Sequence, residues 1–316
     1  MLSRVANSMY WMCRLLERAE NVSRFLSVNL NLLLDLSTYN QMQQWEPMIQ
    51  ITGDQDEYEK KYQDYSQENV IRFLTFDKDY ANSIISCLIT ARENARSVRE
   101  IISSDMWEQL NNFFLELKEA EAKSWAYENP HKFFNIVKMR GHLFSGLLYS
   151  TMTHNEAWHF SRMGLLIERA DKISRILDVK YFLLLPKIDY VGTPYDNIQW
   201  AATLKSASAL EMYRKRFHRI SSYNVSDFLV FEDNFPRSIR YCVNKAKESM
   251  HRITGSSMES SLTVAEKSIG RLKADLDYTD IEEVISTGMH EFIDNFQKKL
   301  NNVDNAINVT FFKTKQ

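Results

Sequence analysis

The sequence predicts an all-α fold, a helical bundle built from two internally duplicated halves that are related by an approximate pseudo-twofold axis. Three observations lead to this prediction. The 316 residues include only 8 glycines and 5 prolines, fewer than the many turns of a sheet protein need. Apolar residues recur every three or four positions along long stretches, which is the period of an amphipathic helix. Distinct motifs of the first half also return in the same order in the second half.

A Glu-Arg motif supplies the clearest repeat. The sequence Leu-Leu-Glu-Arg-Ala-Glu ends at Glu20, and Leu-Ile-Glu-Arg-Ala-Asp ends at Asp171, which is a displacement of 151 residues. Later motifs recur at a displacement of 155 residues; the Gln-Trp pair that ends at Trp45, for example, returns as the pair that ends at Trp200. An apolar period alone does not reproduce several different motifs in one order, so the pattern indicates an internal duplication.

The duplication determines the domain organisation that we expect. A single domain covers residues 1–316, and its repeated halves are 1–150 and 151–316. Two halves of common origin are expected to pack about a pseudo-twofold axis, as the two subunits of an isologous dimer do.

The first half is predicted to be a series of helices, beginning with a long one over residues 2–35. Trp45 opens the next helix, and a turn at Gly53 ends it. Residues 57–65 carry charges and spaced tyrosines, which is typical of a surface helix. Asp79 is the expected N-cap of the helix that follows. The remaining helices of this half are expected at 83–103, 107–117 and 133–149.

The second half is predicted to begin with the second Glu-Arg helix. This helix runs from Glu156 to Leu185, and Pro186 ends it. The motifs of the first half then recur up to about Glu248, after which the repeat fades. The last helices are expected at 258–276 and 281–307.

Charge balance and cysteine usage exclude several classes of protein. Lys and Arg number 39 against 41 Asp and Glu, so the net charge favours neither nucleic acid nor an anionic membrane as a partner. Cys13, Cys87 and Cys242 are scattered, which predicts free thiols and neither a disulfide framework nor a zinc site. The first residues lack the pattern of a signal peptide, and no segment reaches transmembrane length. We therefore expect a cytoplasmic protein without a cofactor.

Each Glu-Arg helix presents two carboxylates that lie one turn apart. The four carboxylates belong to Glu17, Glu20, Glu168 and Asp171. Ion pairing is the favoured interpretation, because Arg24 follows Glu20, and Arg175 follows Asp171, at the favourable spacing of four. A divalent metal and a substrate site are the alternatives. Helical bundles that bind two metals usually add histidines at this spacing, and none occurs near Glu17.

An acidic turn and a basic cluster are further candidate binding sites. Asp233 lies in the acidic turn, and Ser238 is placed to cap the helix that follows, with Pro236 suited to the first turn. A helix N-terminus attracts anions, and Arg237 and Arg240 would strengthen such a site, although simple capping with surface arginines is the favoured interpretation. The basic cluster covers residues 214–219. A solvated helix face is its default interpretation, and docking of phosphate or an acidic protein is the alternative.

Four stretches of the sequence are distinctive: MLSRVANSMYWMCRLLERAENVSRFL, ARENARSVRE, LLIERADKISRIL and SDFLVFEDNFPRSIRYC. Together they resemble the alpha-E family of bacterial helical proteins, over nearly the whole chain. The resemblance implies that the motif positions are Glu17, Arg18, Glu168 and Arg169, with Asp233, Pro236, Arg237 and Ser238 from the later segment. It implies no established activity. Members of the family are typically encoded beside a circularly permuted ATP-grasp amidoligase and a transglutaminase-like protein, which the resemblance therefore implies as partners.

Two hypotheses about function follow. In the first, the chain is a non-catalytic accessory protein that docks the amidoligase or presents its peptide substrate. In the second, it is a helical-bundle enzyme that uses the acidic residues of the two Glu-Arg helices with a divalent metal. The sequence contains no Gly-rich phosphate loop, Gly-x-Ser-x-Gly elbow or His-Glu-x-x-His pattern, which favours the first hypothesis.

Overall fold

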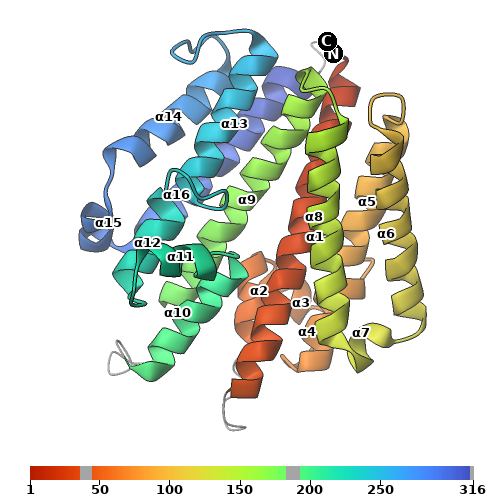
Figure 1. The fold of residues 1–316 in the computed structure, drawn as a ribbon, viewed down its shortest axis with the longest axis vertical. Coiled ribbons are helices and arrows are strands. Elements are labelled where there is room, and N and C mark those ends of the chain that lie inside the picture. Colours follow the sequence, from red (N-terminus) through yellow and green to blue (C-terminus); the bar gives the residue numbers. More distant parts are fainter. Residues whose placement is uncertain (36–44, 183–192, 314–316) are drawn as a thin grey trace. The chain divides into compact units, whose positions relative to one another are not determined.

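A computed structural model describes residues 1–35, 45–182 and 193–313 (Figure 1). These residues form sixteen α-helices and no β-strand, so the predicted all-α class is confirmed. The chain divides into two compact units, of which the first contains Met1 and Ser8–Ser161 and the second contains Leu2–Asn7 and Arg162–Gln316. None of the helices in the described ranges is long and apolar enough to cross a membrane.

Most helices of the first unit are short, apart from α1, α6 and α8. The helices up to residue 151 are α1 Ser3–Asp35, α2 Glu46–Thr52, α3 Gln55–Glu59, α4 Gln67–Phe76, α5 Ile84–Ser97, α6 Ser104–Ala122, α7 Trp125–Glu128 and α8 Pro130–Thr151. Helix α4 packs against α5, α5 against α6, and α6 against α8, and α7 connects the last two. As predicted, Trp45 precedes α2, and Gly53 ends it with a left-handed φ of 77°.

The second unit contains α9 from Arg162 onward and all later helices. Their bounds are α9 Glu156–Phe182, α10 Pro194–Ser206, α11 Leu210–Arg216, α12 Ser222–Phe231, α13 Ile239–Thr254, α14 Val264–Tyr278, α15 Ile281–Thr287 and α16 Met289–Ile307, followed by a π-helical turn, Asn308–Phe312. Helix α12 packs against α13, α13 against α14, and α14 against α16. The order of packed helices is therefore the same as in the first unit.

Amphipathic stripes build the cores of both units. Helix α16, for example, buries Ile293, Phe296, Leu300 and Val303, which follow one another at spacings of three and four residues. Each such side chain contributes about 1.5–3 kcal/mol to folding when it is fully buried. The helices therefore depend on their neighbours for stability more than on intrinsic helix propensity.

The structure corrects three predictions in the first unit. The helix predicted at 83–103 ends at Ser97, and a turn follows it. The N-cap of α5 is Ser83, whose hydroxyl accepts the backbone N–H of Ser86, and not Asp79. The Asp77 carboxylate instead accepts the backbone N–H of Asp79, which places Asp79 inside a turn. The predicted surface helix at 57–65 ends early, at Glu59, and its Tyr58 is fully buried. Tertiary packing explains the burial, because the Tyr58 ring lies in an aromatic cluster with Tyr62, Tyr65 and Phe73.

The structure also corrects predictions in the second unit. The helix predicted at 281–307 is interrupted at Gly288, whose φ of 113° separates α15 from α16. The helix predicted from 258 begins at Val264, because Thr263 and Glu266 form a capping box there. Pro236 lies in the turn before α13 and not in its first turn. The predicted end of the second Glu-Arg helix, at Leu185 and Pro186, lies outside the described residues.

Candidate functional site

The first Glu-Arg motif lies in the middle of α1, on a face that is buried. The side chains of Glu17 and Glu20 are each 2% exposed. Asn21 donates one hydrogen bond to Glu17 Oε1, at 3.0 Å, and another to the backbone oxygen of Glu17. Glu20 forms a buried ion pair with Arg24, at the spacing of four that the sequence predicted. Each carboxylate thus has a partner on its own helix.

Helix α8 packs directly against Glu20. A Cβ atom at Gly141 would lie 2.8 Å from Glu20 Oε2 and 3.0 Å from Glu20 Cγ, which is closer than normal contacts allow. Next to this glycine, His142 Nδ1 lies 3.6 Å from Glu20 Oε1. Gly141 and His142 are neighbours of the motif that sequence reasoning missed. A glycine in the middle of a predicted helix was the available signal, because such a residue often marks close packing.

The second Glu-Arg motif lies in α9 and carries more positive charge. Lys172 Nζ lies 3.5 Å from Glu168 Oε1 and 3.0 Å from Asp171 Oδ2. Arg175 Nε also contacts both oxygens of Asp171, at 3.0 and 3.1 Å. Burial raises the pKa of Asp171, but the two cations outweigh burial and hold the pKa below its ordinary value. Asp171 is therefore ionised at neutral pH, as a structural ion pair requires.

The arginines of the two motifs bind equivalent turns in their own units. Arg18 donates to the side chain of Asn82, in the turn before α5. Arg169 donates to the backbone oxygen of Pro236, at 3.1 Å, in the turn before α13. Each Glu-Arg helix is thereby tied to the N-terminal end of a neighbouring helix, and this is a structural contact.

The acidic turn before α13 contains the remaining candidate residues. Ser238 is fully buried and caps α13 by accepting the backbone N–H of Tyr241. Arg237 is buried and Asp233 is exposed. Arg240 donates to three backbone oxygens, those of Phe231, Leu276 and Thr279. Since two of these oxygens lie at the end of α14, Arg240 fastens α13 to the segment between α14 and α15.

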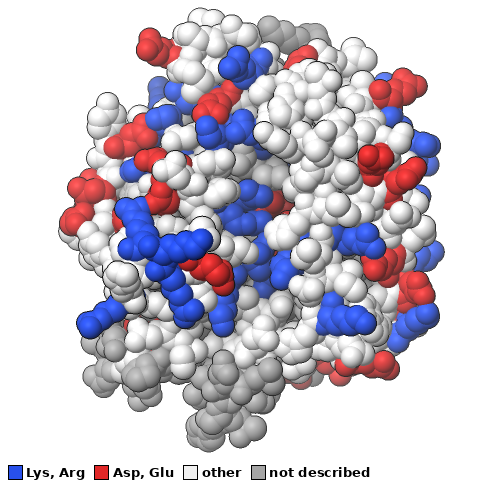
Figure 2. All heavy atoms as spheres, viewed as in Figure 1, with Lys and Arg blue, Asp and Glu red and all other residues white. Residues whose placement is uncertain are grey.

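The predicted basic cluster lies on α11 and the turn after it. Figure 2 shows Lys and Arg side chains gathered over this helix. Arg214, Lys215 and Arg219 are exposed, whereas Arg216 forms an ion pair with Glu232. This surface is solvated, as the default interpretation holds.

The acidic side chains and thiols of the described residues lack the arrangement of a metal centre or of an exposed reactive cysteine. In the three described ranges, no group of three or more His, Cys, Asp or Glu side chains is placed to hold a metal ion. All three cysteines are free and buried. Burial is the main cause that raises the pKa of the Cys13 thiol to about 12, so this thiol is protonated at neutral pH.

Comparison with known proteins places these motifs in a wider group. The model of a family called Alpha-E, described as a predicted alpha-helical domain with a conserved ER motif, matches residues 1–312. An uncharacterized protein of Mycobacterium bovis is 24% identical over 275 residues, which cover 81% of this chain and 30% of the mycobacterial one. An uncharacterized protein of Mycobacterium tuberculosis shows the same identity and coverage. The chain thus spans less than a third of the length of these relatives. No solved structure matches it.

Proposed function

Since this chain belongs to the Alpha-E family, we propose that it is a non-catalytic accessory protein of a peptide-synthesis or protein-modification system. In this role it docks an ATP-grasp amidoligase, together with a transglutaminase-like protein, or presents the peptide substrate. The observation that carries the proposal is the length of the relatives, because the matched segment accounts for 30% of the mycobacterial protein. A segment that is one part of a longer chain is suited to work beside other domains.

The geometry of the Glu-Arg motifs supports a structural role for them. The Glu20 and Arg24 side chains pair with each other, and Asp171 pairs with Lys172 and Arg175. A general acid or base needs a pKa near the working pH, whereas the cations hold the pKa of Asp171 low. The motifs therefore suit a scaffold whose function resides on its surface.

We also propose that the halves 1–150 and 151–316 arose by duplication and retain a pseudo-twofold relation. Contacts repeated within each unit at a displacement of 155 residues support this. Tyr58 donates to the backbone oxygen of Asp64, and Tyr213 donates to that of Arg219. The other repeated contacts are Ser66 with Asn69 and Ser221 with Asn224, Lys61 with Asp77 and Arg216 with Glu232, and Phe73 with Tyr80 and Phe228 with Phe235. An experimental structure whose halves fail to superpose would contradict the proposal.

The same proposal places the protein in the bacterial cytoplasm. An ATP-grasp partner needs ATP, and the three cysteines are free thiols, as expected in a reducing compartment. Fractionation of cells that express the tagged chain tests the location. Recovery with the periplasmic or secreted proteins would contradict it.

Co-purification with an ATP-grasp amidoligase from the same organism tests the proposed function. We expect a complex of defined stoichiometry, and a rate of ATP hydrolysis by the ligase that changes when this chain is added. The chain alone should hydrolyse no ATP. An all-helical protein of similar size and pI serves as the control for nonspecific association.

Two results would contradict the accessory role. One is the absence of a complex with either the ATP-grasp amidoligase or the transglutaminase-like protein. The other is turnover by this chain alone together with tight, stoichiometric binding of Mg²⁺ or Mn²⁺ that the substitution Glu17→Gln abolishes. The second result would support the metal-assisted enzyme instead.

A further inference from the structure

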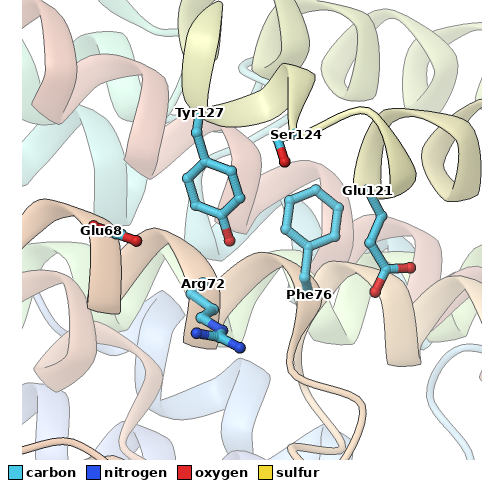
Figure 3. Close-up of a pocket in the computed structure, with 6 residues that line it drawn as sticks. All are labelled: Glu68, Arg72, Phe76, Glu121, Ser124 and Tyr127. Carbon is cyan, nitrogen blue, oxygen red and sulfur yellow. The ribbon is translucent and has the colours of Figure 1, made fainter.

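A pocket of about 480 Å³ opens in the first unit, between α4 and the connection from α6 to α7 (Figure 3). Its size lies within the range of small-molecule sites. The lining residues are Glu68, Arg72, Phe76, Glu121, Ser124 and Tyr127. The first three follow one another at spacings of four residues, so one face of α4 forms a wall. Figure 3 shows the Tyr127 ring and the Ser124 hydroxyl directed toward that wall from the α6–α7 side.

Hydrogen-bond donors meet in this pocket. Arg72 is exposed, and its guanidinium forms no hydrogen bond or ion pair with any residue in the described ranges. Burial raises the pKa of Tyr127 although Arg72 opposes the change, so the phenol keeps its proton and can donate it in a hydrogen bond. Ser124 adds a second hydroxyl. These donors suit a ligand that brings acceptor oxygens.

The remaining lining residues restrict the class of ligand. Phe76 is 8% exposed, and its ring centroid lies 6.0 Å from that of Tyr127, so the pocket has an aromatic side. Two carboxylates, those of Glu68 and Glu121, flank the donors, and Glu121 pairs with Lys78 at 2.9 Å. A guanidinium binds a planar carboxylate through two parallel hydrogen bonds. The flanking carboxylates disfavour a dianion such as phosphate, because like charges repel.

The corresponding face of the second unit is partly covered by another helix. The residues 155 positions after Glu68, Arg72 and Phe76 are Tyr223, Asp227 and Phe231. Helix α12, which carries them, packs against α15, and the Tyr223 hydroxyl donates to Glu282 on that helix. The charge at the central position is also reversed, from Arg72 to Asp227. The open, arginine-bearing face is therefore a property of the first unit.

We propose that this pocket binds the carboxylate end of a peptide. Arg72 forms the ion pair with the terminal carboxylate, and the hydroxyls of Ser124 and Tyr127 add hydrogen bonds. The rings of Phe76 and Tyr127 contact the last side chain, and Glu68 remains available for a cationic group of the ligand. That the ligand is a carboxylate follows from the hydrogen-bond donors of the pocket. That it belongs to a peptide, and not to another carboxylic acid, rests on the proposed function.

Titration of the full chain with the tripeptide Gly-Gly-Phe, up to about 10 mM, tests the proposal, since this range covers weak binding with a dissociation constant in the millimolar range. We expect saturable binding by calorimetry or by chemical-shift changes. Amidation of the peptide carboxylate and the substitution Arg72→Gln should each weaken binding about tenfold or more, since each removes a charge-assisted pair. Arg72→Lys should recover part of the affinity, because it restores the charge without the planar fork.

The substitution Arg252→Gln is the matched control, because Arg252 is an exposed arginine on α13 of the second unit and should leave binding unchanged. Circular dichroism checks that the variants remain folded. Equal binding of the acid and the amide, binding of inorganic phosphate in preference to the peptide, or no binding would each overturn the proposal. The ligase is absent from this experiment. A complex with the ligase that survives Arg72→Gln therefore leaves the accessory role intact even if the pocket assignment fails.

Discussion

The two Glu-Arg motifs hold equivalent carboxylates with partners of different charge. Four residues after the first Glu, α1 has Asn21, which donates to Glu17. The equivalent residue of α9 is Lys172, which lies 3.5 Å from Glu168. The position of the partner is thus the same, whereas a neutral amide in one copy replaces an ammonium in the other. Both copies therefore have a hydrogen-bond donor at this position, and its charge differs between them.

The two motifs also differ in the burial of the ion pair that their second acidic residue forms with an arginine four residues later. Arg24 is 3% exposed in its pair with Glu20. Arg175 is 25% exposed, and Lys172 shares Asp171 with it. Removing one partner of a buried ion pair lowers the free energy of unfolding much more than removing one partner of an exposed pair does. The first copy should therefore be the more sensitive one.

The substitution Arg24→Met gives the sharpest test of this difference. Removing one partner of a buried ion pair is expected to lower the free energy of unfolding by about 3–5 kcal/mol. Arg175→Met should cost clearly less, because Asp171 keeps Lys172 and the lost side chain is partly exposed. Denaturant unfolding of both variants measures the two costs. The exposed pair of Arg96 with Glu93 supplies the control, since Arg96→Met should cost less than about 1 kcal/mol. Equal costs at positions 24 and 175 would refute the distinction.

Substitution of Asp171 tests the ion pairs of the second Glu-Arg motif, which carries more positive charge than the first. Asp171→Asn removes the carboxylate that Lys172 and Arg175 share, at an expected cost of about 1.5–3 kcal/mol near neutral pH. Because the folded-state pKa of Asp171 lies below its ordinary value of 3.8, the stabilisation is present above that value. It is lost as the pH falls through the lowered pKa. Unfolding measured from neutral to acidic pH should show the wild type and the variant converging in acid.

The matched control for this prediction is Asp275→Asn, which breaks the exposed pair of Asp275 with Lys299. Its cost should stay below about 1 kcal/mol. If the difference between Asp171→Asn and the wild type did not change with pH, the ion-pair explanation of the second motif would be wrong.

The sequence was sufficient to predict the all-α class, the two Glu-Arg helices and the ion pairs at a spacing of four. These features depend on residues that are close in the chain, where helical period and i,i+4 spacing are reliable. It missed the break at Gly288 because an isolated glycine in a helical pattern is usually tolerated. It misplaced the cap of α5 because Asp79 and Ser83 are both good N-cap residues, and the turn formed by Asp77 decides between them.

The candidate site depended more on contacts between distant residues. The sequence indicated that Arg18 and Arg169 belong to the motif, but not that they bind the turns at Asn82 and Pro236. The pocket at Arg72 was also missed. Its second wall comes from Tyr127, which local periodicity cannot place opposite α4. Sequence patterns therefore predicted the helices and the ion pairs within each helix, whereas the contacts between different helices became known only from the structure.

Helix α8 offers a smaller test of the close packing in the first copy. Gly141→Ala would place a methyl group 2.8 Å from Glu20 Oε2, so we expect a loss of about 1–3 kcal/mol. Gly146 lies on the same helix, and a methyl group there would meet no described atom within 4 Å, so Gly146→Ala should stabilise the protein by up to about 1 kcal/mol. Thermal unfolding of the two variants in parallel measures both effects. A Gly141→Ala variant that is as stable as Gly146→Ala would show that the packing of Glu20 does not require the glycine.

The smallest expected effect concerns an ion pair of the second unit whose acidic residue is replaced by a serine at the equivalent position of α1. Asp178 on α9 accepts a hydrogen bond from His290 on α16, with 2.6 Å between Oδ1 and Nδ1, whereas Ser27 stands 151 residues before Asp178. This hydrogen bond is the main cause that raises the pKa of His290 above its ordinary value of 6.5. The stabilisation should therefore be full below about pH 6.5 and be lost as the pH rises through the raised pKa.

Since His290 is 44% exposed, solvent screens the pair, and His290→Gln should cost less than about 1 kcal/mol even in acid. A double-mutant cycle with Asp178→Asn, measured on both sides of the histidine pKa, isolates the coupling from other effects of each substitution. A coupling that persists undiminished at alkaline pH would mean that the neutral hydrogen bond holds the two helices together. A coupling that appears only in acid would mean that the charge of His290 links α16 to α9. The uncharged Ser27, at the equivalent position of α1, cannot form such an ion pair.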